Sequence, residues 1–259
     1  VIDPKRRDGK AWGGTTALAL LAFLENDLHP DLQAGYAHHL ASSVDDQGRV
    51  LGDFDVGSQT WPEQDEVTYA QGQVLLALAA AEGANLPGVE HALSRTIEHV
   101  EESYWPQPAS RMAILDEHWI CLAAEETRKV RSVAAGEAVC RAWLVDRYPF
   151  DIDAPLAPTA GAAGATAEAF VAAAWMDRAS GADGQALEQA RAYGQLFLDQ
   201  RYQASDAPLL VQPRALVGGF RDKPWKLDVR VDAVQHIGFA LLGLAELLQG
   251  LEIAPPTPT

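Results

Sequence analysis

The chain has 259 residues, 48% of them hydrophobic, and carries 36 acidic against 20 basic residues, for a formal net charge of -16. This composition can supply a sizeable core, whereas the negative charge disfavours nucleic acid and anionic lipid as partners. We find no run of about 18 apolar residues, so we expect no membrane insertion.

Apolar residues recur with the period of a helix along the whole chain, and the alternation typical of strands is almost absent. Gly13 and Gly14 lead into the first helix, and Pro30 suits the first turn of the second. Residues 47–61 are rich in Gly and Asp and are predicted to form a long loop, with a small hairpin as an alternative. A second long loop is predicted over residues 203–227. The other predicted helices cover residues 66–82, 87–103, 112–127, 132–148, 166–180, 184–202 and 229–251, and the first covers residues 15–25.

The predicted helices alternate in character. The odd-numbered ones are rich in Ala and Leu and begin with small or polar residues, whereas the even-numbered ones are more charged. The repeat of roughly 50 residues is within the range of helical-pair repeats. An inner ring of apolar helices and an outer ring facing water explain this alternation. We therefore predict an all-α fold, an α/α toroid or barrel of about five to six helical hairpins, with long loops at one mouth.

The predicted toroid is a single domain over residues 1–251, followed by a flexible Pro/Thr tail over residues 252–259. An open solenoid is the alternative. The long loops favour the closed toroid, because an active-site mouth is where long loops usually occur.

The two cysteines, Cys121 and Cys140, lie inside apolar helical patterns and match no zinc-binding spacing. This setting favours buried free thiols over a disulfide or a metal ligand. It leaves the redox compartment, and hence the localisation, open. Because the chain begins at Val1 rather than Met, removal of an upstream export signal is one alternative, and a longer parent protein is another.

The alternating helices resemble the α/α toroids over nearly the whole chain. This superfamily includes six-hairpin glycosidase-like enzymes, among them sugar epimerases and polysaccharide lyases, and the terpenoid cyclase and protein prenyltransferase group. Residues 218–226 (GGFRDKPWK), followed by Asp232 and by residues 236–244 (HIGFALLGL), are similar to the prenyltransferase β-subunit segment that contains a zinc-binding histidine. Here the gap before His236 is longer, and no Asp-x-Cys is present. The resemblance thus implies the toroid but no zinc, and we predict no metal and no cofactor.

The last helix carries the first candidate catalytic pair. Asp232 and His236 are spaced i,i+4, so their side chains share one face of a helix. A carboxylate that orients an imidazole and raises its basicity is suited to acid–base catalysis. A helix-terminal charge beside a core histidine is the alternative. Arg230 and the preceding loop residues Arg221 and Trp225 are predicted to bind substrate near this pair.

A second candidate group follows the fourth predicted helix. Asp116 and Glu117 are candidate catalytic acids, although acids near a helix start also favour the helix dipole. Next to them and in the preceding loop, the predicted substrate-binding residues are Trp105, Arg111, His118 and Trp119.

Further candidates lie at the starts of other inner helices. Trp61 and Tyr69 are predicted to bind substrate, and Gln71 and Gln73 follow in the same helix. Glu168 stands isolated in an Ala-rich helix and is a further candidate catalytic acid. The remaining histidines lie in outer helices or turns and are predicted at the surface: His29, His38, His39, His91 and His99.

We find no Walker A loop, G-x-S-x-G, H-E-x-x-H or EF-hand pattern. Tryptophan rings beside carboxylates suit a sugar, which offers apolar ring faces and hydroxyl groups. We therefore predict a carbohydrate-active enzyme of the hydrolase, lyase or epimerase type, with a glycan or a small molecule as substrate. Two carboxyl groups about 5 to 10 Å apart would suit glycoside hydrolysis, whereas a His/Tyr pair with Arg would suit a lyase or epimerase. The alternatives are an isoprenoid-type toroid enzyme and a non-catalytic binding or scaffold domain of a larger protein.

Overall fold

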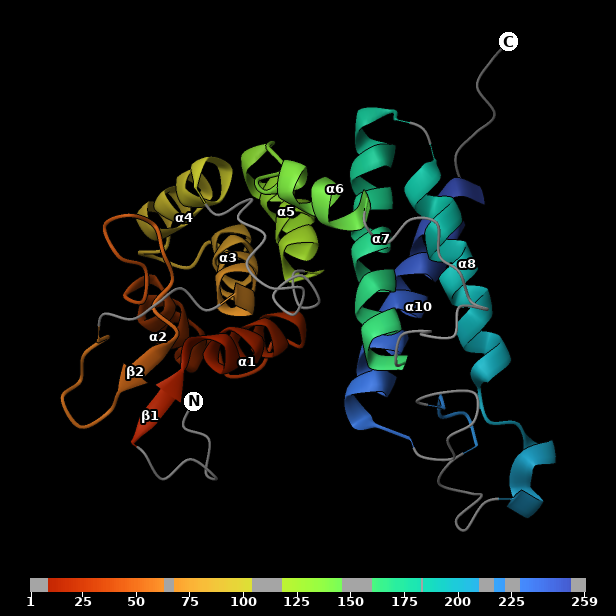
Figure 1. The fold of residues 1–259 in the computed structure, drawn as a ribbon. Helices are drawn as coiled ribbons and strands as arrows, with labels where there is room; N and C mark the ends of the chain where they lie inside the picture. Colours follow the sequence, from red (N-terminus) through yellow and green to blue (C-terminus); the bar gives the residue numbers. More distant parts are fainter. Residues whose placement is uncertain are drawn as a thin grey trace. The chain divides into compact units, whose positions relative to one another are not determined.

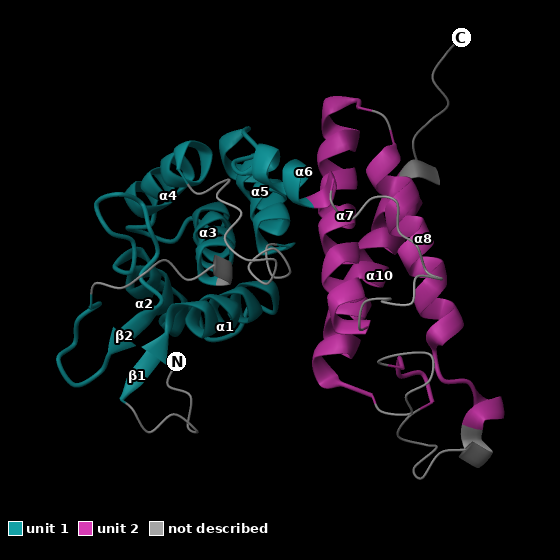
Figure 2. Cartoon of the chain, viewed as in Figure 1, with its two compact units in different colours: residues 1–143 teal, residues 144–259 magenta. Residues whose placement is uncertain are grey.

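The protein is described from a computed structural model, whose chain path is drawn in Figure 1. Its contacts divide the chain into two compact units, residues 1–143 and residues 144–259 (Figure 2). Each unit is treated separately below. The structure describes residues 9–62, 68–103, 118–145, 160–182, 184–209, 217–221 and 229–252.

Among its described residues, unit 1 contains helices and one small two-stranded sheet. The sheet pairs β1 (Lys10–Trp12) with β2 (Asp53–Asp55) in antiparallel fashion. The last helix, α6, crosses the boundary between the units. The helices are α1 (Gly13–Glu25), α2 (Pro30–Ala41), α3 (Thr68–Gly83), α4 (Glu90–Glu102), α5 (His118–Arg131) and α6 (Glu137–Val145).

In unit 1, α3 packs between α1 and α5. A Cβ atom added at Gly72 would lie 2.7 Å from the Cβ of Trp119, and one added at Gly83 would lie 3.1 Å from Val130. These contacts join the start of α3 to the start of α5 and the end of α3 to the end of α5, so the two helices run parallel. The glycines allow close backbone approach because they carry no side chain at the contact.

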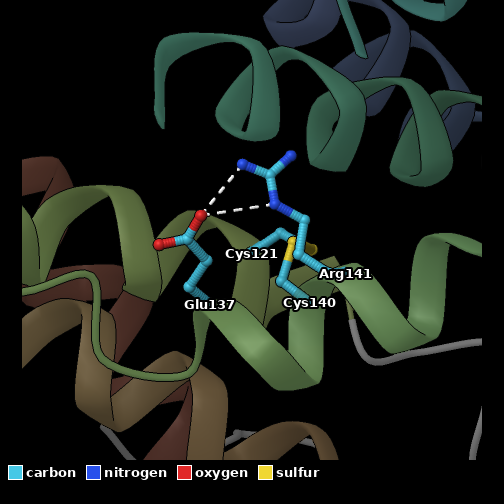
Figure 3. Close-up of a disulfide and its surroundings, with 4 residues drawn as sticks. All are labelled: Cys121, Glu137, Cys140 and Arg141. Atoms are coloured by element: carbon cyan, nitrogen blue, oxygen red, sulfur yellow. Dashed lines mark hydrogen bonds and ion pairs between the residues drawn. A yellow bond between two sulfur atoms is a disulfide. The ribbon is translucent and has the colours of Figure 1, made fainter. Parts of the chain in front are cut away.

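A disulfide joins α5 to α6 (Figure 3). The Cα atoms of Cys121 and Cys140 lie 4.8 Å apart and the two sulfur atoms are bonded. The backbone N–H of Ala135 also donates to the hydroxyl of Thr127, at 3.0 Å. The prediction of free thiols was therefore wrong. Each cysteine has an apolar helical setting, but their approach depends on the path of the connection between α5 and α6, which the sequence spacing does not show.

Unit 2 contains α7 (Ala160–Ser180), α8 (Gln185–Gln200), the 3-10 helix η2 (Ala204–Leu209) and α10 (Val231–Glu252). Helix α7 packs on both α8 and α10. Three contacts at intervals of seven residues show that α7 and α10 run parallel. They join Gly164 to His236, Val171 to Gly243, and Arg178 to Gly250.

The prediction of a mostly helical, all-α fold is confirmed, since helices cover more than half of the chain. Predicted inner helices α3 and α7 are buried around most of their circumference, whereas α4 and α8 bury one face. Helix α7 begins at Ala160 rather than at residue 166, because Gly161 and Gly164 pack against the start of α10. The closed toroid remains a prediction, as does the single domain over residues 1–251.

The loop predicted over residues 47–61 supplies strand β2, which pairs with β1 near the N-terminus of the described chain. Gly48, with a φ of 78°, lies against α4 in this loop. A Cβ added there would lie 2.8 Å from the Cβ of His99. His99 is buried, so its predicted surface position was wrong.

Residues Val231–Gly250 of α10 are long and apolar enough, by length and composition alone, to cross a membrane. No other helix among the described residues meets this criterion. The same helix buries one apolar face, including Ile237, Leu244 and Leu247, within the protein. Its other apolar side chains include Val231, Phe239 and Leu242, which are exposed.

Candidate active site

In unit 2, a largely buried polar contact joins α7 to α10. Nδ1 of His236 lies 2.8 Å from Oε2 of Glu168, within hydrogen-bond distance. The side chain of Glu168 is 6% exposed and that of His236 is 18% exposed. Two residues predicted separately as catalytic candidates thus meet in one largely buried pair.

Local sequence explains why the two helices come close enough for this contact. Helix α7 is rich in Ala around Glu168, so the long acidic side chain stands among small neighbours. One turn earlier, a Cβ added at Gly164 would lie 2.7 Å from the Cβ of His236 and 2.9 Å from the backbone nitrogen of Ile237. The missing side chain at Gly164 therefore sets the separation of the helices and the position of the imidazole.

Burial dominates the electrostatics of Glu168. Removal from water raises the pKa of its carboxyl group above the ordinary value, while the hydrogen bond and charge of His236 act in the opposite direction. The net direction is upward. A positive charge on His236 would offset part of the cost of burying the carboxylate.

The i,i+4 spacing favoured His236 as the partner of Asp232, but the structure pairs Asp232 with Arg230. It is exposed and forms a two-pronged ion pair with Arg230, whose Nε and Nη2 donate at 3.0 and 2.5 Å. The hydrogen bond from Arg230 lowers the pKa of Asp232. The i,i+4 spacing predicts a shared helix face correctly, but Glu168 supplies the carboxylate that contacts His236.

Arg221, predicted to bind substrate, belongs to a polar contact beside α8. Its Nη2 lies 3.1 Å from Oδ2 of Asp206, and its guanidinium lies 4.7 Å from the centre of the Tyr202 ring. Tyr202 is buried. These contacts give Arg221 a structural role in anchoring the segment after α8.

The candidates in unit 1 lie at the starts of helices. His118 is the first residue of α5 and is buried, with its ring centre 4.6 Å from that of Trp119. Trp61 is partly exposed, and its indole N–H donates to Oγ of Ser42 at 3.1 Å. Both tryptophan rings thus lie near the N-terminal ends of predicted inner helices.

Gln71 has a structural role that the sequence does not show. Its Oε1 accepts the backbone N–H of Val50 at 2.8 Å, and its Nε2 donates to the carbonyl of Gly48 at 3.2 Å. The side chain is fully buried and fixes the loop to α3. Its position as an isolated polar residue in an Ala/Leu-rich helix indicates a special role, but the sequence does not identify the loop as the partner of Gln71.

Several predicted site residues cannot be placed. Tyr69 lies in α3, but its side chain is outside the described part of the structure. The predictions for the following residues concern positions outside the described residues: Trp105, Arg111, Asp116, Glu117 and Trp225.

A carboxylate and an imidazole are also common metal ligands, so Glu168 and His236 are chemically able to contribute to a metal site. The expected absence of a metal or cofactor therefore remains a prediction.

Comparison of the chain with models of known protein families, with curated proteins and with solved structures gives no match. The functional argument consequently rests on the residues of this chain.

Proposed function

We propose that this protein is a carbohydrate-active enzyme in which His236 transfers a proton and Glu168 positions the imidazole. The observation that carries the proposal is the 2.8 Å contact between Nδ1 of His236 and Oε2 of the buried Glu168. A fixed imidazole with a carboxylate behind it is a common arrangement for acid–base catalysis.

The geometry assigns different roles to the two ring nitrogens of His236. Because Nδ1 faces Glu168, Nε2 is the nitrogen that would exchange a proton with the substrate. The carboxylate of Glu168 would stabilise the imidazolium that forms when Nε2 takes a proton. Glu168 acts through His236 and is therefore a positioning residue.

This pairing favours a lyase or an epimerase over a glycoside hydrolase. β-Elimination by a lyase, and epimerisation at a carbon whose proton is acidic, both begin when a base removes a proton from a carbon of the sugar. Glycoside hydrolysis usually employs two carboxyl groups that flank the scissile bond. In the proposed site the carboxylate of Glu168 is directed at the imidazole instead.

Two observations support a carbohydrate substrate. They are the resemblance of the sequence to α/α toroid enzymes and the position of Trp61 and Trp119 near the starts of helices. A closed toroid is part of the proposal, because its mouth would gather the ends of the inner helices. The parallel course of α3 with α5, and of α7 with α10, is compatible with such a ring.

The test is turnover of neutral and uronate-containing oligosaccharides, with His236→Gln, Asp232→Asn and His91→Gln as variants. His91 is an exposed histidine on α4, so its substitution is a matched control. We expect His236→Gln to lower kcat by about 10²- to 10⁴-fold with the fold retained, and the other two variants to remain active.

Absence of turnover on every sugar in the panel would contradict the enzyme proposal and favour the binding-domain alternative. A His236→Gln protein that remains fully active would remove His236 from the mechanism. If Asp232→Asn alone is inactive, the i,i+4 carboxylate is the functional one.

A further inference from the structure

Helix α10 presents two large apolar side chains to solvent in the middle of its length. Phe239 is 59% exposed and Leu242 is 64% exposed. Another face of the same helix packs in the core of unit 2 through Ile237, Ala240 and Leu244. Because an aromatic ring and a leucine side chain side by side in water lose the free energy that burial would provide, this exposed face is a candidate interaction surface.

Six exposed positions of α10 repeat with the period of a coiled coil. They are spaced at intervals of three, four, three, four and three residues, which is the 3.5-residue repeat of a seam between two helices. Val234 and Ala245 are also exposed and border these positions. The six residues, named the α10 seam below, are Asp232, Gln235, Phe239, Leu242, Glu246 and Gln249. The apolar members of the seam lie at its centre, and the polar members lie on both sides of them.

The α10 seam is complementary to itself when two copies of the helix run antiparallel. A two-fold axis between Phe239 and Leu242 places each of these residues opposite the other one in the second copy. The same axis places Gln235 of each copy opposite Glu246 of the other. The amide N–H of Gln235 can then donate to the carboxylate of Glu246, so an apolar centre is flanked by hydrogen-bonded pairs.

The ends of the seam follow the same rule. The antiparallel arrangement places Asp232 opposite Gln249 of the second copy. Arg230 donates two hydrogen bonds to Asp232 within one chain, and a carboxylate can accept further ones, so Gln249 can donate to it without displacing Arg230.

A parallel arrangement of the two helices would be unfavourable. It would place Asp232 opposite Asp232 and Glu246 opposite Glu246, so that like charges meet at both ends of the seam. The antiparallel arrangement avoids these contacts and also brings opposite ends of the two helix dipoles together.

We propose that this protein forms a reversible dimer in which the α10 seam packs antiparallel against the same seam of a second copy. Contact between Phe239 and Leu242 supplies the attraction, and the single pair of helices makes a small interface and hence a weak dimer. The net charge of -16 on each copy opposes association at long range. Because salt screens this repulsion and leaves the apolar contact intact, the dimer tightens as salt rises. The inference does not rest on the proposed function.

The first test is sedimentation equilibrium of the whole chain between about 1 µM and 1 mM. We expect the mass to rise with concentration toward twice that of one chain, and the association constant to increase about tenfold between about 0.05 and 0.5 M salt. Leu242→Lys should weaken association by about tenfold or more, because the new ammonium group would lie against Phe239 of the second copy.

Leu32→Lys is the matched control for this variant. Leu32 is an exposed leucine of α2 in unit 1, so its substitution makes the same change of side chain and of net charge away from the α10 seam. It should associate as the parent protein does. Both leucines are exposed, and equal thermal melting of the two variants shows that each keeps the fold.

The second test determines the direction of the helices by disulfide crosslinking. Gln235→Cys and Glu246→Cys are prepared as separate proteins and oxidised alone and as a mixture. We expect a crosslinked dimer in the mixture and none with either variant alone. Cys121 and Cys140 are buried and bonded to each other, so they do not contribute a thiol.

The proposal is overturned if the chain sediments as a monomer at every concentration, or if Leu242→Lys associates as strongly as the parent. Crosslinking of Gln235→Cys with itself would indicate a parallel pairing and contradict the antiparallel one. Flotation with phosphatidylcholine vesicles tests a lipid surface as the other occupant of this face, which the polar members of the seam disfavour. Vesicle binding by the parent chain that is lost in Leu242→Lys, from a chain that is monomeric in solution, would assign the face to lipid and overturn the dimer.

Discussion

Glu168 and His236 lie 68 positions apart in the chain, yet one oxygen of the carboxylate lies 2.8 Å from Nδ1 of the imidazole. The parallel packing of α7 on α10, with Gly164 against His236, creates this approach. The contact joins two residues that are each unusual in an apolar helix. Stability and proposed activity are therefore coupled at the same point of unit 2.

The first prediction concerns the disulfide between Cys121 and Cys140. Its 19-residue separation closes a loop for which chain-entropy estimates give about 3 kcal/mol of stabilisation. Reduction should therefore lower the free energy of unfolding by about this amount, measured by urea denaturation with and without dithiothreitol. Such bonds persist in oxidising compartments, which favours an exported protein.

The control for this experiment is the double variant Cys121→Ser/Cys140→Ser, whose stability should not respond to dithiothreitol. The neighbouring pair of Glu137 and Arg141 is retained in it (Figure 3). Titration of two thiols in the native, unreduced protein would show that the disulfide is not formed.

The second prediction concerns Gly164. In Gly164→Ala, the new Cβ would approach the backbone of Ile237 to 2.9 Å, so α7 and α10 must separate. We expect a loss of about 1 to 3 kcal/mol, the range for overpacking, and a lower turnover because the imidazole shifts. The matched control is Gly238→Ala, where a Cβ meets nothing within 4 Å. Equal melting temperatures for the two variants would contradict the close packing at Gly164.

The third prediction concerns pH. Because burial raises the pKa of Glu168, the folded state binds its proton more tightly than the unfolded state does. The contribution of Glu168 to stability should therefore fall as pH rises from the ordinary glutamate pKa through the raised one. Urea denaturation of the parent and of Glu168→Gln across this interval measures the difference. If the parent protein instead gains stability relative to Glu168→Gln as pH rises, the pKa of Glu168 is lowered on folding and the prediction is wrong.

Much of the fold could be predicted from the helical period of the apolar residues. The pattern predicted the end of α1 at Glu25, and Pro30 at the first turn of α2. The start of α7 could not be predicted from this pattern. Gly161 and Gly164 disfavour a helix locally, and the advantage of glycine there is the close packing against α10.

The candidate site could be predicted in part. Glu168 and His236 stood out as ionisable groups in apolar helices, but a spacing within one helix favoured Asp232 as the partner. Contacts between helices depend on their register, which a single sequence does not determine. The same limit explains the missed disulfide, whose two cysteines lie on different helices.

The measurement that tests the central proposal most directly is a double-mutant cycle on Glu168 and His236. The kcat on the best substrate among the tested oligosaccharides is measured for the parent, Glu168→Gln, His236→Gln and the double variant, with circular dichroism to confirm folding. If Glu168 acts through His236, the double variant should be no slower than His236→Gln alone, because groups that work as one unit cannot be lost twice. Independent, multiplicative losses, or full activity in His236→Gln, would contradict the account.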